Sequence, residues 1–269
     1  MSGIPEPRHD GGFDVPTRWM SGVGAYAELD EDAFIDGALI LSIGGAQQSH
    51  VDVHRPDRVF YEYLQRIAHV LDLVRPPGAP LRVLHLGAGA LTLVRYVQAK
   101  RPGSRQVAVD IEGELLDFVL DAMPLAPGTE CRMVVDDAAA VVRDQADDSF
   151  DAVVLDIFAD ADAPAHLTGP RFTADLLRIC AEDGVLLVNI GDDPPLRFAR
   201  EQSRQIASLA EGTAVLTEAG MVGGELAGNV VVAARRTPWP ESWTTALLAR
   251  GPHPAAVLVG AGREAFERG

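Results

Sequence analysis

The stretch that decides the fold runs from Arg82 to Glu112 and reads RVLHLGAGALTLVRYVQAKRPGSRQVAVDIE. An apolar run ends in a glycine-rich turn, a helical pattern follows as far as Pro102, and a second apolar run ends at Asp110. A strand that enters a turn containing Gly87 and Gly89 and then a helix lets backbone N–H groups approach a ligand closely. The turn lacks the third glycine of a dinucleotide fingerprint, so taken alone it also fits a tight turn that binds nothing.

The same alternation continues toward the C-terminus. Further strand patterns cover residues 129–137, 149–158 and 184–192, and a last pair covers 212–219 and 228–236. Helical patterns separate all but that last pair. Strands separated by helices of this length predict an α/β protein with a Rossmann-like, doubly wound parallel sheet and right-handed crossovers. The last pair is expected to lie antiparallel at one edge.

The N-terminal part has a different pattern. Residues 1–24 are rich in Gly and Pro without periodicity, which predicts a flexible arm. Residues 25–56 hold short apolar runs separated by Asp-Gly and Gly-Gly, which predicts a small antiparallel β-hairpin unit. A helical pattern with Asp57 as its candidate N-cap then opens the Rossmann-like domain at 57–236. We expect 237–269 to be a C-terminal tail with one weak helix.

Composition excludes several classes of function. The 269 residues carry 39 acidic and 23 basic side chains, a net charge of -16, which disfavours nucleic acid because its phosphates pair with Lys and Arg. No apolar run is long enough for a membrane span, and the N-terminus lacks the apolar core of a secretory signal, so we expect a cytoplasmic protein. Cys131 and Cys180 are isolated in sequence, which predicts neither a disulfide framework nor a metal site.

Three carboxylates follow strand patterns in order along the chain. Asp110, Asp137 and Asp156 each end one predicted strand, and open α/β sheets bind ligands at the carboxyl ends of their strands. A single such Asp often caps a helix, but the three together with the glycine turn favour a ligand. Asp110, about 20 residues beyond the turn, suits ribose hydroxyls, and Asp137 suits the adenine amine. The set predicts an adenosine-type ligand related to S-adenosylmethionine rather than NAD or ATP.

The chain from about Ala38 to Arg235 resembles the spermidine synthase family, the aminopropyltransferases that use decarboxylated S-adenosylmethionine. In particular it is similar to an actinobacterial subgroup of spermidine synthase-like proteins. The segments that carry the resemblance are GAQQSHVDV, FYEYLQRIAHVLDL, the stretch quoted above, VVLDIFADADAPAHLTGPRF, VNIGDDPPLRFAR and GNVVVAA. The resemblance implies a methyltransferase-type fold with a small N-terminal antiparallel β unit, assembled as a homodimer or homotetramer.

The resemblance also implies roles for individual residues. Asp156 matches the aspartate that helps to deprotonate the attacking amine, a general base in chemical terms. Asp160 and Asp162 are both candidates to match the second aspartate of the family's Asp-x-x-Asp-Pro loop. The residues matched to cofactor binding are Gln48, Gly87, Gly89, Asp110, Glu112 and Asp137. On the acceptor side we expect Tyr61, Glu62, Asp162, His166 and Asp192, with a structural or gating role for His166 ahead of catalysis.

One departure from the family leaves more than one function open. The family's glycine loop usually carries an aspartate that holds the aminopropyl ammonium, and here residues 87–90 are Gly-Ala-Gly-Ala. We expect transfer of an aminopropyl group from decarboxylated S-adenosylmethionine to a small amine such as putrescine. The alternatives are an S-adenosylmethionine-dependent methyltransferase of a small metabolite, with Arg95 as a remote partner for the methionine carboxylate, and a non-catalytic nucleoside-binding homologue.

Overall fold

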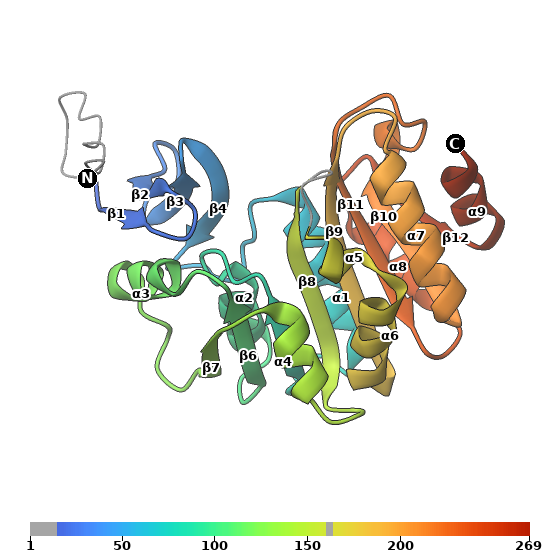
Figure 1. Ribbon diagram of the computed structural model, residues 1–269, viewed down its shortest axis with the longest axis horizontal. Coiled ribbons are helices and arrows are strands. Elements are labelled where there is room, and N and C mark those ends of the chain that lie inside the picture. The colour runs from blue at the N-terminus through green and yellow to red at the C-terminus, as the bar shows by residue number, and fades with distance from the viewer. Residues whose placement is uncertain (1–14, 160–163) are drawn as a thin grey trace.

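An eight-stranded mixed sheet forms the centre of the protein in a computed structural model that describes residues 15–159 and 164–269 (Figure 1). The strand order is β12-β10-β11-β9-β8-β5-β6-β7, and the five strands from β9 to β7 are parallel. The strands are β5 (Arg82–Leu86), β6 (Arg105–Asp110), β7 (Glu130–Val135), β8 (Phe150–Ala159), β9 (Cys180–Asp192), β10 (Gly212–Glu218), β11 (Gly228–Arg235) and β12 (Ala255–Val259). The predicted doubly wound α/β sheet is confirmed.

Helices cover both faces of this sheet. One apolar cluster joins the sheet to α4 (Ala138–Asp144), α5 (Ala165–Thr168), α6 (Pro170–Ile179), α7 (Arg197–Leu209) and α9 (Gly260–Arg268). A second cluster on the other face joins it to α1 (Glu62–Val74), α2 (Thr92–Lys100) and α8 (Glu241–Arg250). Because both faces are buried, the central strands are continuous apolar runs such as VLLV in β9 rather than alternating patterns.

A separate four-stranded antiparallel sheet lies at one end of the molecule (Figure 1). It contains β1 (Thr17–Met20), β2 (Ala25–Glu31), β3 (Ala38–Ile43) and β4 (Ala46–Asp52) in sequential order. Gly44 and Gly45 both have positive φ in the two-residue turn between β3 and β4, as a hairpin turn of this length requires. The small sheet packs on α3 (Gly113–Ala122) and the start of α2 through a third apolar cluster.

Three boundaries differ from those expected. Residues 17–20 belong to β1, which pairs with β2, so this part of the expected arm is ordered. α1 begins at Glu62 with Tyr61 at its N-cap position, and the expected N-cap, Asp57, instead accepts a hydrogen bond from Arg55 Nε. The expected tail contributes β12, which pairs antiparallel with β10 and becomes the edge strand beyond the predicted β10–β11 pair. Its apolar run of five residues, AAVLV, was too short to distinguish a strand from a helix.

The strand order indicates where a ligand-binding site is expected. The chain runs from β5 outward to β6 and β7, then returns across the sheet to β8, so the order reverses between β5 and β8. Ligands of open α/β sheets bind at the carboxyl ends of the strands beside such a reversal. Among the helices that the structure describes, none is long and apolar enough to cross a bilayer.

Candidate functional site

Two cavities open at the carboxyl ends of the parallel strands. The first has a volume of about 540 Å³ and lies between the glycine turn, the small sheet and α5. The second, about 550 Å³, lies between α1, the end of β9 and the start of β11. Four residues line both cavities, Gln48, Tyr63, Asp156 and Ile157. The carboxylate of Asp156 therefore stands where two ligands placed in the two cavities would meet.

The glycine turn forms one wall of the first cavity. Gly87 has φ of +87°, and a Cβ added there would lie 2.2 Å from the Asp156 carbonyl oxygen. A side chain at this position is thus excluded by the neighbouring strand as well as by the backbone conformation. Gly89 has φ of +49°, and its added Cβ would lie 2.8 Å from Ser49 Oγ. The two glycines let the turn lie flat against β8 and the small sheet.

Asp110 and Asp137 line the same cavity from neighbouring strand ends. Asp110 accepts the Ala88 N–H at 2.9 Å and the Glu112 N–H at 3.0 Å, which ties the glycine turn to the end of β6. Asp137 caps α4 by accepting the Ala140 N–H at 3.0 Å. Each carboxylate is held by the backbone in a fixed position, and each has lone pairs left for a ligand.

His166 on α5 reaches across the mouth of the first cavity to Asp137. Its Nε2 lies 2.7 Å from Asp137 Oδ2, and both side chains are more than a third exposed. Burial raises the pKa of Asp137, but the hydrogen bonds from His166 and the Ala140 N–H outweigh it and lower the pKa overall. Within the described residues, Asp137 Oδ2 therefore lies against His166, and Asp137 Oδ1 accepts the Ala140 N–H.

Asp156 combines burial with two hydrogen-bond donors. Asn189 Nδ2 donates to its Oδ1 at 2.8 Å, and the Tyr63 hydroxyl also donates to the carboxylate. Burial raises the pKa of Asp156 above its ordinary value, and the Asn189 and Tyr63 hydrogen bonds oppose this rise without cancelling it. A carboxylate with a raised pKa is a stronger base, which suits proton abstraction from an incoming group.

The second cavity is rich in polar side chains. Tyr61 and Glu62 line it from the start of α1, and Glu62 pairs with the buried Arg66 at 3.1 Å. Glu218, at the end of β10, also lines this cavity, and within the described residues its carboxylate has no hydrogen-bond or ion-pair partner. A free carboxylate on the wall of a cavity that also holds Asp156 suits a cationic ligand.

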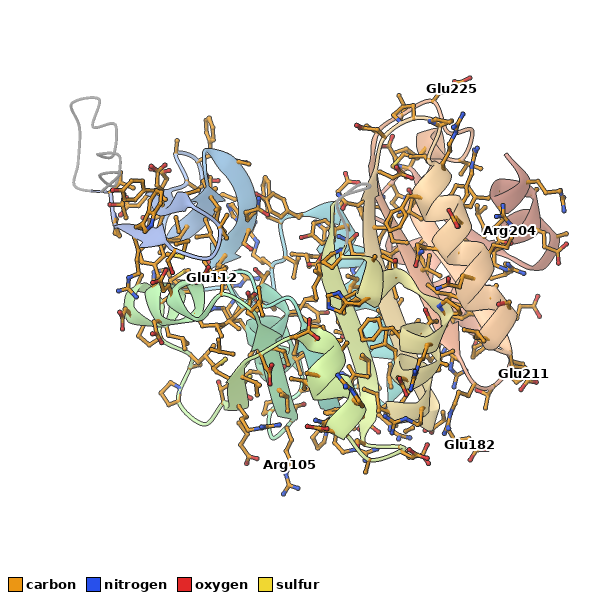
Figure 2. The ribbon with its side chains drawn as sticks, viewed as in Figure 1. Arg105, Glu112, Glu182, Arg204, Glu211 and Glu225 are labelled. Atoms are coloured by element: carbon orange, nitrogen blue, oxygen red, sulfur yellow. The ribbon has the colours of Figure 1, made fainter. Side chains whose placement is uncertain are left out.

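Several predicted residues lie elsewhere. Figure 2 shows Glu112 beside α3 under the small sheet, where it is 8% exposed and caps α3, so it does not line either cavity. Asp192 accepts the Ala199 N–H at 2.9 Å in the first turn of α7 and also lines neither cavity. Both positions follow a strand and precede a helix, where a carboxylate satisfies free helix N–H groups. Asp160 and Asp162 lie outside the described residues.

Arg95 is unable to serve the ligand as expected. It is 7% exposed and lines neither cavity, and its guanidinium donates to the carbonyl oxygens of Ala90, Met123 and Pro124. Burial lowers its pKa to about 10, which still leaves it charged near neutral pH. Its role is to join α2 to the end of α3.

Sequence reasoning missed three residues of the site. Tyr63 has helical spacing with apolar neighbours, which favoured a core position, and Glu218 belongs to a strand whose pairing was unknown. Asn189 could have been identified from the sequence, because it is a single polar residue in the apolar run VLLVNI. No cluster of three or more His, Cys, Asp or Glu placed to hold a metal occurs in the described residues.

Comparison with known proteins gives a consistent result. No protein-family model matches the chain. A polyamine aminopropyltransferase from Alkalilimnicola ehrlichii is 27% identical over 202 residues, and the match covers 73% of this chain and 65% of that protein, slightly less than two thirds of its length. A crystal structure of a probable spermidine synthase from Corynebacterium glutamicum superposes with a TM-score of 0.82 at 25% identity, covering 98% of this chain and 95% of that one.

Two more distant structures share the fold. Spermidine synthase from Thermotoga maritima has a TM-score of 0.59 at 16% identity, covering 90% of this chain and 85% of that one. Human methyltransferase-like protein 13, solved in complex with SAH, has a TM-score of 0.56 at 18% identity, covering 78% and 92%. The topology of the sheet defines a methyltransferase-type α/β fold with an added N-terminal antiparallel sheet. Among proteins with this fold, the chain is similar to a polyamine aminopropyltransferase and to a probable spermidine synthase.

Proposed function

We propose that this protein transfers an aminopropyl group from decarboxylated S-adenosylmethionine to an amine acceptor such as putrescine. The observation that carries the proposal is the position of Asp156, which lines both cavities at their junction. A group transfer needs a donor cavity and an acceptor cavity that meet at the reacting atoms. The similarity to a polyamine aminopropyltransferase supports the same reaction class.

The first cavity is the proposed site of the nucleoside donor. Asp110 would accept hydrogen bonds from the ribose hydroxyls and Asp137 from the adenine amine, with Gln48 contacting the nucleoside from β4. The methyltransferase-like protein with the same fold was solved with SAH, which supports a ligand of the S-adenosyl type. A volume of about 540 Å³ lies in the range of cavities that bind small molecules.

The chemical step follows from the acceptor's position beside Asp156. An ammonium nitrogen that enters from the second cavity donates one proton to the Asp156 carboxylate and becomes nucleophilic. Its lone pair then forms a bond to the aminopropyl carbon, while the bond from that carbon to the sulfonium sulfur breaks. The bonding pair returns to sulfur, so the donor leaves as the neutral thioether methylthioadenosine. A sulfonium needs no acid to leave, and one base is therefore sufficient.

The first cavity favours a donor without a carboxylate. No Arg or Lys lines it in the described ranges 15–159 and 164–269, and Arg95 donates to backbone carbonyls away from it. Intact S-adenosylmethionine would bring its carboxylate into a cavity walled by Asp110, Asp136, Asp137 and Asp156. Like charges in a partly buried cavity repel each other, and this argues against the methyltransferase alternative.

Calorimetric titration tests the proposal before any turnover is measured. Decarboxylated S-adenosylmethionine and methylthioadenosine are expected to bind at least tenfold more tightly than intact S-adenosylmethionine. Incubation of the decarboxylated donor with putrescine should then release methylthioadenosine together with spermidine. Tighter binding of the intact form would favour methyl transfer instead, and binding without turnover on any amine would favour a non-catalytic homologue.

We also propose that the protein works in the cytoplasm as a homodimer or homotetramer, in line with the family resemblance. Light scattering coupled to size-exclusion chromatography would give the assembly state.

A further inference from the structure

His85 is a polar side chain in the middle of the central strand β5. It interrupts the apolar run VLHL, and it is 3% exposed. The first cavity reaches this far into the fold, since His85 lines it together with Val94 of α2 and Leu64 of α1. A buried polar group on the wall of a cavity calls for an account of its hydrogen bonds.

One ring nitrogen of His85 is used by the protein itself. Its Nε2 lies 2.9 Å from Gln106 Oε1, and Gln106 Nε2 donates to the Val94 carbonyl oxygen at 3.1 Å. The second bond turns the amide oxygen of Gln106 toward the ring, so His85 Nε2 carries the proton and donates. Burial lowers the pKa of His85 to about 4, and the ring is therefore neutral near neutral pH. The other nitrogen, Nδ1, is left as an acceptor without a proton.

This free acceptor, His85 Nδ1, faces the first cavity. It has no hydrogen-bond partner among the described residues, yet it is not one of the fully buried side-chain atoms that lack a partner. Part of its surface is therefore accessible. Because His85 as a whole is nearly inaccessible and lines the first cavity, that surface lies in the cavity. A ligand group that donates an N–H or O–H would satisfy it.

Strand register gives the position of His85 relative to Asp156. His85 pairs with Val154 on β8, two residues before Asp156, and the rise of a strand places it about 7 Å deeper in the sheet. Both side chains lie on the face that α1 covers, because Tyr63 donates to Asp156 and Leu64 lines the cavity with His85. A short chain that starts beside the Asp156 carboxylate and runs inward therefore ends near the imidazole.

We infer that His85 is a donor-binding residue whose Nδ1 accepts a hydrogen bond from the ammonium group at the end of the aminopropyl chain. The inference rests on the proposed function, since it places the S-adenosyl donor in the first cavity. With the nucleoside on Asp110 and Asp137 and the reacting carbon beside Asp156, the three-carbon chain leads into the deeper part of the cavity. The ammonium is then the one hydrogen-bonding group of the donor that still needs an acceptor.

The surroundings of His85 match such a chain. Val154 is its partner in register, and Val94 and Leu64 complete an apolar wall that suits three methylene groups. A carboxylate in the place of the ammonium would set its lone pairs against Nδ1, which has no proton to donate. It would also find no arginine or lysine on the described walls of this cavity. His85 thus selects for a positively charged end of the chain and against a negatively charged one.

Two variants separate this acceptor from the buried hydrogen bond that holds it. His85→Leu removes Nδ1 together with the bond to Gln106. Gln106→Leu removes the same bond but leaves the imidazole in place, and Gln106 does not line the cavity. Both variants lose a buried hydrogen bond, so Gln106→Leu is the matched control for stability. Only His85→Leu should change recognition of the ammonium.

The experiment compares, by calorimetry, decarboxylated S-adenosylmethionine with the analogue that carries a propyl group in place of the aminopropyl group. Both are sulfonium nucleosides, so the ratio of their affinities reports the ammonium alone. His85→Leu should reduce this ratio by about tenfold or more, as expected for a hydrogen bond to a charged group. Gln106→Leu should leave the ratio unchanged.

An unchanged ratio in a folded His85→Leu variant would overturn the inference. If His85→Leu does not fold, the double variant His85→Leu with Gln106→Leu replaces both partners of the buried bond by apolar side chains, a change that proteins tolerate better. It should show the same reduction, and an unchanged ratio there would overturn the inference equally.

Calorimetry needs neither an acceptor nor turnover, which separates this inference from the proposed function. A ratio that depends on His85, in a protein that transfers no aminopropyl group to putrescine, would refute the proposed function and leave the inference standing. Transfer to putrescine with a ratio that does not depend on His85 would refute the inference alone.

Discussion

The exchange Asp156→Asn tests the assigned base while disturbing the structure very little. The side chain keeps its size, and the new amide oxygen can still accept from Asn189 Nδ2, which lies 2.8 Å from Asp156 Oδ1. The new amide nitrogen faces the Tyr63 hydroxyl, whose oxygen can accept its proton. We therefore expect a folded protein with both cavities intact.

The magnitude follows from the role of the lost group. General bases contribute about 10²- to 10⁴-fold to rate, which is about 3 to 5 kcal/mol of activation free energy at 1.36 kcal/mol per factor of ten. Nucleoside affinity should change by less than about threefold, because the proposed nucleoside contacts, Asp110 and Asp137, lie at the ends of other strands. Burial raises the pKa of Asp156, so the acid limb of the wild-type pH–rate profile should lie above the ordinary aspartate pKa. This acid limb should disappear in the variant.

The assay is release of methylthioadenosine from decarboxylated S-adenosylmethionine in the presence of putrescine, followed between pH 5 and pH 9. Asp193→Asn is the matched control, since Asp193 is exposed and lines neither cavity. It should retain full activity. An Asp156→Asn variant within tenfold of wild-type kcat/KM would refute the assignment of Asp156 as the base.

Three further predictions follow from local geometry. Gly87→Ala combines a positive φ with a contact of 2.2 Å between the added Cβ and the Asp156 carbonyl oxygen, so it should lower the free energy of unfolding in urea by about 2 to 4 kcal/mol and abolish nucleoside binding. The control Gly103→Ala, with φ of +83° and open space around the added Cβ, should lower it by about 1 kcal/mol. His166→Ala should alter methylthioadenosine affinity but not the free energy of unfolding, because the contact of His166 with Asp137 is exposed. Unaltered affinity would show that His166 does not contact the ligand. Asp151→Asn should cost about 2 to 3 kcal/mol at pH 7 because buried Asp151 accepts from Arg75 and Arg82.

The pH dependence of the Asp151 effect has a definite sign. Burial raises the pKa of Asp151, but the hydrogen bonds from Arg82 and Arg75 outweigh it, so the folded-state pKa lies below the unfolded one. The stabilisation is complete above the unfolded value of about 3.9 and is lost as the pH falls through the folded value. The difference between wild type and Asp151→Asn should therefore shrink in acid, and a constant difference down to pH 2 would contradict this reasoning.

The amino-acid sequence by itself determined the architecture and one side of the site. Strand and helix patterns, Gly-Gly hairpin signals and the glycine turn are local features, and each depends on residues a few positions apart. Gly87, Asp110, Asp137 and Asp156 were identifiable because the carboxyl ends of parallel strands share one edge of a sheet. The first cavity contains all four.

The lining of the second cavity was decided only by tertiary structure, as was the exclusion of two expected site residues. Glu112 and Asp192 follow strands just as Asp110 does, and only the packed chain shows that their carboxylates cap helices instead of lining a cavity. Asn189 and Tyr63 reach Asp156 from β9 and α1, elements separated by more than a hundred residues. Their convergence depends on strand register and helix packing, which no local periodicity encodes. The unsatisfied oxygen of Asn189 exists only because the fold brings Asp156 and Asn229 to its amide nitrogen.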